Sequence, residues 1–269
     1  MQQRAMAHLS VPVVGMGTSG TLDLPDDQLA LAAAITDAAL DSGSTLIDTS
    51  PMYGRAEAVL CRALAERRPQ ALIATKVWTA DDEEAERQIT TSLAYFGGHV
   101  ELFQIHNLVG WRTRLDQLER RRDQGQVTLI GATHWRAQAY PELEEVMRTD
   151  RLDAIQVPYN PLEQRVSERV LPLAADLGLG VLVMRPLGGG GLSDAAPTGK
   201  DLAPLRAAGL TSWSQALLAW ALSDPRVSSV IPASSQPAHV ADNARAGSLP
   251  ALDPAVRHEI ERLATRPRS

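Results

Sequence analysis

Eight short runs of aliphatic and β-branched residues recur along the 269-residue chain, and this repeat limits its fold more than any other feature. The runs predict strands at Val11–Gly15, Thr45–Asp48, Ala71–Thr75, Val100–His106, Val127–Thr133, Ala154–Val157, Gly180–Met184 and Val227–Ile231. Amphipathic, helix-forming stretches separate most of them, and strands that alternate with helices at this spacing form parallel βαβ units. Eight such units in about 250 residues predict an α/β fold of the (β/α)8 TIM-barrel type.

No linker-like segment interrupts the repeat, so we expect a single barrel domain over residues 1–269. An extra helix is predicted at Pro254–Thr265, after the eighth unit. The segment Arg185–Thr211, after the seventh predicted strand, is rich in Gly, Pro and Ala and predicts a long loop; loops of that length are usually functional or mobile. A doubly wound sheet is the alternative architecture, because it also alternates strands with helices.

Composition and charge narrow the class of partner. The net charge of -6 comes without basic runs interleaved with aromatic residues, which argues against nucleic acid. The apolar stretch around Val11–Met16 is too short for a signal peptide or a membrane span, so we expect no membrane partner. Cys61 is the single cysteine and has no partner for an internal disulfide, which favours a cytoplasmic protein. We expect a monomer or weak dimer that acts on a small molecule.

Polar residues stand at the ends of three successive predicted strands. Asp48 ends the second strand, Lys76 follows the third and His106 ends the fourth, while Tyr53 lies in the loop after Asp48. Each has a simple structural explanation alone: a turn aspartate, a solvated lysine, a packing histidine. Because active sites of such barrels lie at the carboxyl ends of the strands, their joint occurrence favours catalytic chemistry.

Lysine is rare in this chain, since only Lys76 and Lys200 are lysines among 26 basic residues. A lysine in such a chain suggests a role that arginine cannot fill, namely a compact cation beside a phenol. Such a cation stabilises the phenolate that forms when Tyr53 donates a proton. We therefore predict that Tyr53 protonates a carbonyl oxygen, Asp48 is the counter-ion of Lys76, and neutral His106 orients the substrate. A Schiff-base lyase that uses Lys76 is the alternative.

These motifs give the chain a resemblance to a known family. The segments "IDTSPMYGRAE", "ATKVW" and "QIHN" resemble the signatures of the aldo-keto reductases, and the likeness runs from "VVGMGT" through "VIPASSQPAHVADN". The resemblance implies a (β/α)8 barrel and NAD(P)H-dependent reduction of an aldehyde or ketone, with Tyr53 as general acid. NADPH is the expected cofactor and NADH the alternative, and we expect no metal. A non-catalytic nicotinamide-binding regulatory subunit would share much of this resemblance.

The resemblance also implies cofactor contacts, with several departures from the family. Thr133-His134 replaces the usual Ser-Asn pair that grips the nicotinamide carboxamide, and Gln156 matches the other carboxamide contact. Met184-Arg185 replaces an aromatic residue and a serine. The other expected cofactor residues are Gly17, Thr18, Leu187, Gly188, Gly189, Ser234, Ser235, His239 and Asn243.

Two glycine- and serine-rich motifs bear on the nucleotide. "GMGTSG" (15–20) matches the dinucleotide fingerprint, but the fingerprint must open a helix directly, and "TLDLPDD" intervenes. Ser234 and Ser235 precede a predicted helix whose amino terminus favours an anion. Ala233 and His239 stand where much of the family has a lysine and an arginine around the 2′-phosphate of NADPH, so we expect a weak preference for NADPH.

Three tryptophans follow predicted strand ends on the active face: Trp78, Trp111 and Trp135. They are candidates for an aromatic pocket that receives an apolar carbonyl compound. Packing beneath loops is the equally supported alternative.

Overall fold

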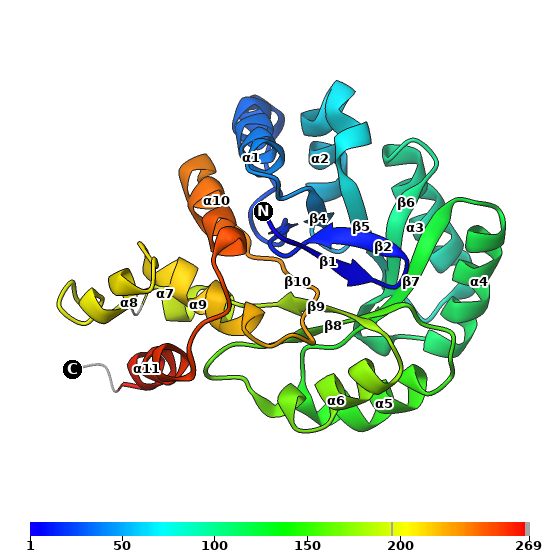
Figure 1. Ribbon diagram of the computed structural model, residues 1–269. Coiled ribbons are helices and arrows are strands. Elements are labelled where there is room, and N and C mark those ends of the chain that lie inside the picture. Colours follow the sequence, from blue (N-terminus) through cyan, green and yellow to red (C-terminus); the bar gives the residue numbers. More distant parts are fainter. Residues whose placement is uncertain (195, 267–269) are drawn as a thin grey trace.

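Eight parallel strands follow one another in sequence order around a closed barrel in the computed structural model, which describes residues 1–194 and 196–266 (Figure 1). The strands are β3 (Met16–Gly17), β4 (Leu46–Asp48), β5 (Leu72–Val77), β6 (Val100–Ile105), β7 (Val127–Thr133), β8 (Ala154–Pro158), β9 (Gly180–Met184) and β10 (Ser229–Val230). Parallel bridges from Val14 to Val230 and from Gly17 to Ala233 join the first strand to the last. This closure confirms the predicted (β/α)8 barrel and excludes the doubly wound sheet, which stays open.

Helices follow the strands and surround the barrel (Figure 1). They are α1 (Leu29–Asp41), α2 (Ala56–Leu64), α3 (Asp82–Tyr95), α4 (Trp111–Asp123), α5 (Tyr140–Met147), α6 (Val170–Asp176), α9 (Trp213–Leu222) and α10 (Pro237–Ala244). The sequence pattern does not predict α5, whose buried apolar face consists of Leu143, Val146 and Met147. Its eight residues show less than three turns of helical periodicity. No helix in the described ranges combines the length and apolarity needed to cross a membrane.

The predicted terminal helix and long loop are both confirmed. The terminal helix is α11 (Pro254–Ala264). Residue 195 lies outside the described residues. The rest of the segment 185–211 contains the short helices α7 (Gly191–Asp194) and α8 (Ala203–Ala207) but no long helix. After β3 the chain turns at Gly20 (φ 70°), and α1 begins only at Leu29. The "GMGTSG" motif therefore opens no helix, as expected.

The predicted boundaries of the first barrel strand are wrong. Leu9–Pro12 forms β2, which pairs antiparallel with β1 (Gln3–Met6) in an amino-terminal hairpin, and the first barrel strand begins only after it. A turn at Ala7 (φ 50°) folds Leu9–Pro12 back on β1, so the apolar run is divided between the hairpin and the barrel. Met6 packs against Gly180 at the start of β9, where a Cβ would overlap the methionine side chain. The hairpin thus covers the amino-terminal end of the barrel.

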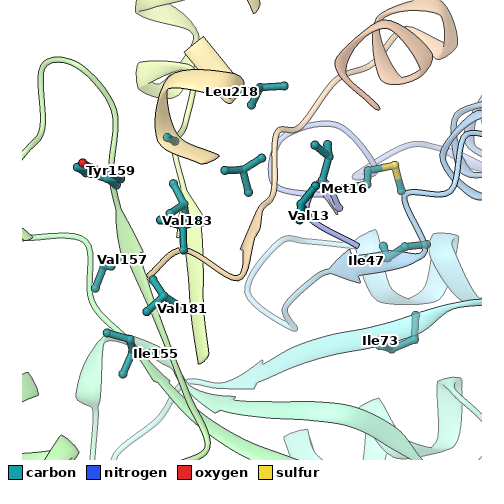
Figure 2. Close-up of a cluster of buried hydrophobic side chains, with 14 of the residues drawn as sticks. Val13, Met16, Ile47, Ile73, Ile155, Val157, Tyr159, Val181, Val183 and Leu218 are labelled. Carbon is teal, nitrogen blue, oxygen red and sulfur yellow. The ribbon is translucent and has the colours of Figure 1, made fainter. Parts of the chain in front are cut away.

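Alternation along the strands separates two apolar layers. Side chains such as Ile47, Ile73, Ile155 and Val183 belong to the larger core between barrel and helices (Figure 2). A second cluster takes one residue from most strands and two from the hairpin: Met6, Val11, Leu46, Ala74, Leu102, Leu129, Ala154, Leu182 and Ile231. Such a layer is typical of a barrel interior.

The next inward layer is mostly polar. Side chains in a strand point to the same face every second residue, so the residues two positions beyond the apolar layer also point into the barrel. They are Asp48, Lys76, Gln104, Gly131, Gln156 and Met184. The apolar layer is therefore a floor that carries the candidate site at the carboxyl ends of the strands.

Candidate active site

A buried ion pair forms the centre of the site. Lys76 on β5 is fully buried, and its Nζ donates to Asp48 Oδ2 at 2.6 Å and to the Thr49 carbonyl at 2.7 Å. Burial disfavours the ammonium, but the charges of and hydrogen bonds to Asp48 and Tyr53 together outweigh it, so the pKa of Lys76 is raised above its ordinary value. Lys76 is therefore a fixed cation at neutral pH.

The second carboxylate oxygen of Asp48, Oδ1, accepts hydrogen bonds from two side-chain amides. Gln104 on β6 donates through Nε2 to Asp48 Oδ1 at 3.0 Å, and Gln156 on β8 donates to the same oxygen at 2.7 Å. Gln156 Nε2 also lies 3.2 Å from Gln104 Oε1. Gln104 was not among the predicted site residues, although it stands two residues before His106, a spacing that places both side chains on one face of the strand. Gln156 was expected as a cofactor contact, and the structure shows that its amide nitrogen is held by Asp48.

Tyr53 lies over this pair. The Lys76 Nζ is 4.9 Å from the centroid of the Tyr53 ring, and the rings of Tyr53 and His106 meet edge to face with centroids 6.0 Å apart. Burial raises the pKa of Tyr53, and the nearby charge of Lys76 lowers it without cancelling that effect. The phenol thus keeps its proton at neutral pH, as a proton donor must.

The loop that carries Tyr53 is fixed by Asp23. The carboxylate of Asp23 accepts a hydrogen bond from the Arg55 backbone N–H at 2.9 Å. Gly54 has a φ of 62°, and a Cβ at this position would overlap the Asp23 carboxylate. Glycine therefore meets both a conformational and a steric requirement directly after Tyr53.

His106 is held as a neutral ring. Burial, followed by the charges of Lys76 and His134, lowers the pKa of His106 from 6.5 to about 3. Its Nδ1 lies 3.4 Å from Ser50 Oγ. A neutral imidazole can donate or accept a hydrogen bond at a substrate oxygen, which suits an orienting role.

Three expected carboxamide contacts lie side by side at the adjacent ends of β7 and β8: Thr133, His134 and Gln156. The directions of their hydrogen bonds are defined. Thr133 Oγ1 accepts the Asn107 N–H at 3.2 Å, which leaves its own O–H as a donor. His134 Nδ1 accepts the Arg136 N–H at 3.0 Å. Burial lowers the pKa of His134, so its neutral ring carries the proton on Nε2 as a second donor.

Arg185 directly follows β9 in a left-handed conformation, with a φ of 53°. Its guanidinium lies 3.6 Å from Glu163 Oε1 and 5.7 Å from the centroid of the Trp135 ring. Asn160 Nδ2 donates to the Arg185 carbonyl at 3.0 Å. Bulky residues adopt such a φ rarely, and at functional sites the surrounding contacts maintain it.

The other expected cofactor residues follow the ends of β3, β9 and β10. A Cβ at Gly17 would lie 2.9 Å from the Ile231 carbonyl, so this glycine allows β3 to approach β10 closely. Thr18 is buried, and its hydroxyl has no hydrogen-bond partner among the described residues. Ser234 Oγ accepts the Gln236 N–H at 3.2 Å just before α10. In the same region Ser235, His239 and Gly189 are exposed, Leu187 and Gly188 are half-buried and Asn243 is buried.

The three tryptophans do not share one environment. Trp78 and Trp135 follow β5 and β7 and are 43% and 41% exposed. Trp111 is buried, belongs to the larger core and donates its indole N–H to Glu142 at 3.2 Å. Two of the three tryptophans thus lie at the surface beyond the strand ends, while Trp111 packs between α4 and α5.

Comparison with known proteins identifies the family. Residues 13–265 match the sequence profile of the Aldo/keto reductase family. Two Bacillus subtilis proteins are similar: aldo-keto reductase YhdN, 29% identical over 184 residues (61% of this chain, 54% of YhdN), and the uncharacterized oxidoreductase YrpG, 30% identical over 198 residues (61% and 60%). The matched region thus spans less than two thirds of either relative. A Klebsiella pneumoniae aldo-keto reductase, solved in complex with NADPH, shares the fold with a TM-score of 0.80 at 24% identity, over 97% of this chain and 93% of that one. The chain belongs to the aldo/keto reductase family.

Proposed function

We propose that the protein reduces a small aldehyde or ketone to an alcohol, with NADPH as hydride donor and Tyr53 as general acid. The observation that best supports this proposal is the buried Lys76–Asp48 pair, whose ammonium lies 4.9 Å from the centroid of the Tyr53 ring. A phenol in this position keeps its proton until it is transferred, and the adjacent cation then stabilises the phenolate. This is the electrostatic requirement for protonating a carbonyl oxygen while carbon receives hydride.

The nicotinamide, when bound, supplies the hydride, and the protein residues supply the proton and the geometry. Tyr53 donates its proton to the carbonyl oxygen, and Lys76 offsets the charge that appears on the phenol. Asp48 is the counter-ion that holds the Lys76 ammonium in place. Neutral His106 hydrogen-bonds the same carbonyl oxygen and fixes its direction, because burial and the charge of Lys76 keep the ring unprotonated.

The polar groups at the ends of β7 and β8 fit a nicotinamide carboxamide. A carboxamide offers one acceptor, its oxygen, and one donor, its NH2 group. The Thr133 O–H and the His134 Nε2–H are donors for the oxygen, and Gln156 Oε1 is an acceptor for the NH2 group. His134 thus keeps a donor in place of the asparagine that is usual in the family.

The phosphate groups are assigned to the loops after β9 and β10. Arg185 offers a guanidinium, and Ser234 and Ser235 precede the amino terminus of α10, where free N–H groups favour an anion. Ala233 has no charge and His239 is exposed, so the 2′-phosphate lacks a strong cation at these positions. We therefore infer that NADPH is preferred over NADH by less than about a thousandfold, or about 4 kcal/mol.

The surface beyond the strand ends suggests an apolar substrate. Trp78, Trp135 and Met52 are all at least 40% exposed and follow β5, β7 and β4 respectively. Large apolar side chains exposed around a polar centre favour ligands with an apolar body. We propose an aromatic or aliphatic carbonyl compound as the substrate class.

Titration with NADPH and with NADH, followed by tryptophan fluorescence, tests the proposal, together with a panel of aldehydes and ketones. Binding at micromolar concentrations without added metal and reduction of at least one carbonyl are expected. Failure of both nucleotides to bind would refute the proposal. A Schiff-base lyase predicts instead that borohydride traps a carbonyl substrate on Lys76. The raised pKa of Lys76 opposes this alternative, because an ammonium is not a nucleophile.

A further inference from the structure

We propose that Gln104 is a positioning residue, which links the Asp48 carboxylate to the acceptor that Gln156 presents to the cofactor carboxamide. The inference rests on the proposed function, since it needs a bound nicotinamide. It concerns a residue outside the Asp48, Tyr53, Lys76 and His106 set, and it gives the barrel interior a part in orienting the cofactor.

The hydrogen-bond directions in this cluster follow from the charge of Asp48. A carboxylate paired with an ammonium can only accept, so both glutamines must turn their Nε2 groups toward Oδ1. Gln156 uses its second N–H on Gln104 Oε1 at 3.2 Å. If the Gln156 amide were reversed, its oxygen would face two other acceptors. One orientation is therefore strongly favoured.

Burial makes this preference strong. Gln104, Gln156 and Asp48 are 0%, 2% and 3% exposed. Water cannot readily replace a lost partner in such a cluster, and an unpaired buried polar group is costly. The three side chains therefore act as one unit.

Gly131 allows the two glutamines to meet. Gln104 lies on β6 and Gln156 on β8, with β7 between them, and Gly131 on β7 pairs with Gln104 on one side and with Ala154 on the other. A Cβ at Gly131 would lie 3.0 Å from Gln104 Cγ and 3.2 Å from the Ala154 carbonyl. Because no side chain projects from β7 at this point, the amides make contact across it.

The consequence reaches the cofactor through Gln156. Both of its N–H groups are occupied, by Asp48 and by Gln104, so Oε1 remains for a ligand that donates a hydrogen bond. An amide held by one hydrogen bond can rotate about its last side-chain bond, whereas an amide held by two cannot. Gln104 thus fixes the direction in which Gln156 offers its acceptor to the carboxamide NH2 group.

A cofactor analogue isolates this contact. In the 3-acetylpyridine analogue of NADP+, a methyl ketone replaces the carboxamide, which keeps the oxygen acceptor and removes the N–H donor. Calorimetric titration of the wild-type protein should show that the analogue binds at least about tenfold more weakly than NADP+, or about 1.4 kcal/mol. Gln104→Met should reduce this ratio of dissociation constants at least threefold. Gln117→Met, which removes a buried amide on α4, should leave it unchanged.

Gly131→Ala provides a second perturbation if Gln104→Met does not fold. The added methyl group pushes on Gln104 without removing its amide, and it should reduce the ratio in the same direction. A ratio that changes less than threefold in the variant that folds, or a wild-type protein that binds both nucleotides equally, would overturn the inference alone. If the wild-type protein binds neither nucleotide, the proposed function fails and the inference with it.

Discussion

Replacing Lys76 by methionine removes the cation that contacts Asp48 at 2.6 Å, while nearly preserving side-chain length. Both side chains are at most 4% exposed, so the substitution leaves a buried charge without its ionic partner. Losing one member of a buried pair usually costs about 3–5 kcal/mol. Because Gln104 and Gln156 still donate to Oδ1, we expect a cost near the lower end, about 3 kcal/mol. For a chain of this size, that cost lowers Tm by about 6–12 °C.

Activity should fall for a separate reason. Without the Lys76 ammonium, the phenolate of Tyr53 would form beside the unpaired carboxylate of Asp48, which raises the free energy of proton donation. We expect kcat to drop at least about a hundredfold, or about 2.7 kcal/mol. Dissociation constants for nucleotide should stay within a few-fold of wild type, since Lys76 bonds to Asp48, Thr49 and Tyr53 and not to the residues assigned to the nucleotide.

Two companion variants separate stability from catalysis. Adding Asp48→Asn to Lys76→Met removes the unpaired buried charge, so it should recover most of the lost Tm without recovering kcat. Lys76→Arg keeps the charge but introduces a larger planar group, which should displace the phenol and also leave little activity. Thermal melts and steady-state oxidation of NADPH on the three variants provide the measurement. Carbonyl reduction by Lys76→Met at the wild-type rate would show that the lysine is only structural and that the reasoning is wrong.

Tyr53→Phe should bind nucleotide normally but lose at least about a hundredfold in kcat, whereas unchanged turnover would mean that another group donates the proton. His106, with a pKa lowered from 6.5 to about 3, contributes stability that is complete above pH 6.5 and is lost as pH falls toward 3. Between pH 7 and 4.5 the wild type should therefore lose roughly 3 kcal/mol more than His106→Gln in denaturant titrations, and parallel losses would contradict the neutral ring. Arg185→Met should weaken nucleotide binding about tenfold, and Glu163→Gln, which removes the carboxylate 3.6 Å from Arg185, should strengthen it; equal affinities in calorimetry would remove Arg185 from the phosphate site.

The sequence was sufficient to predict the barrel and the residues that lie at the carboxyl ends of its strands. The strand–helix repeat depends on local periodicity, which a single sequence contains, and strand direction then brings Asp48, Lys76 and His106 to one end of the barrel. The boundaries of the first strand were wrong because an apolar run does not show where the chain reverses. The turn at Ala7 and the contact of Met6 with Gly180 depend on tertiary packing.

The hydrogen bonds inside the barrel could not be predicted from the sequence. Strand alternation places Gln104 on the same face as His106, but it does not show that Gln104 reaches Asp48 or meets Gln156 across β7. That contact depends on the closure and register of the sheet, which bring Gly131 between the two glutamines. Trp111 could not be assigned from the sequence either. A residue after a strand end can line a pocket, but it can equally begin a helix and pack in the core, as Trp111 does.

Transfer of deuterium from the nucleotide to a carbonyl carbon provides the decisive test of carbonyl reduction. The protein is incubated with NADPH that carries deuterium at the reactive C4 position and with a reactive aromatic aldehyde such as 4-nitrobenzaldehyde, and the product is analysed by mass spectrometry. We predict an alcohol with one deuterium on its carbinol carbon, formed at least about a hundredfold more slowly by Tyr53→Phe. If the wild-type protein binds the nucleotide but forms no labelled alcohol from any carbonyl of the panel, with deuterated NADPH or NADH, the protein is not a carbonyl reductase.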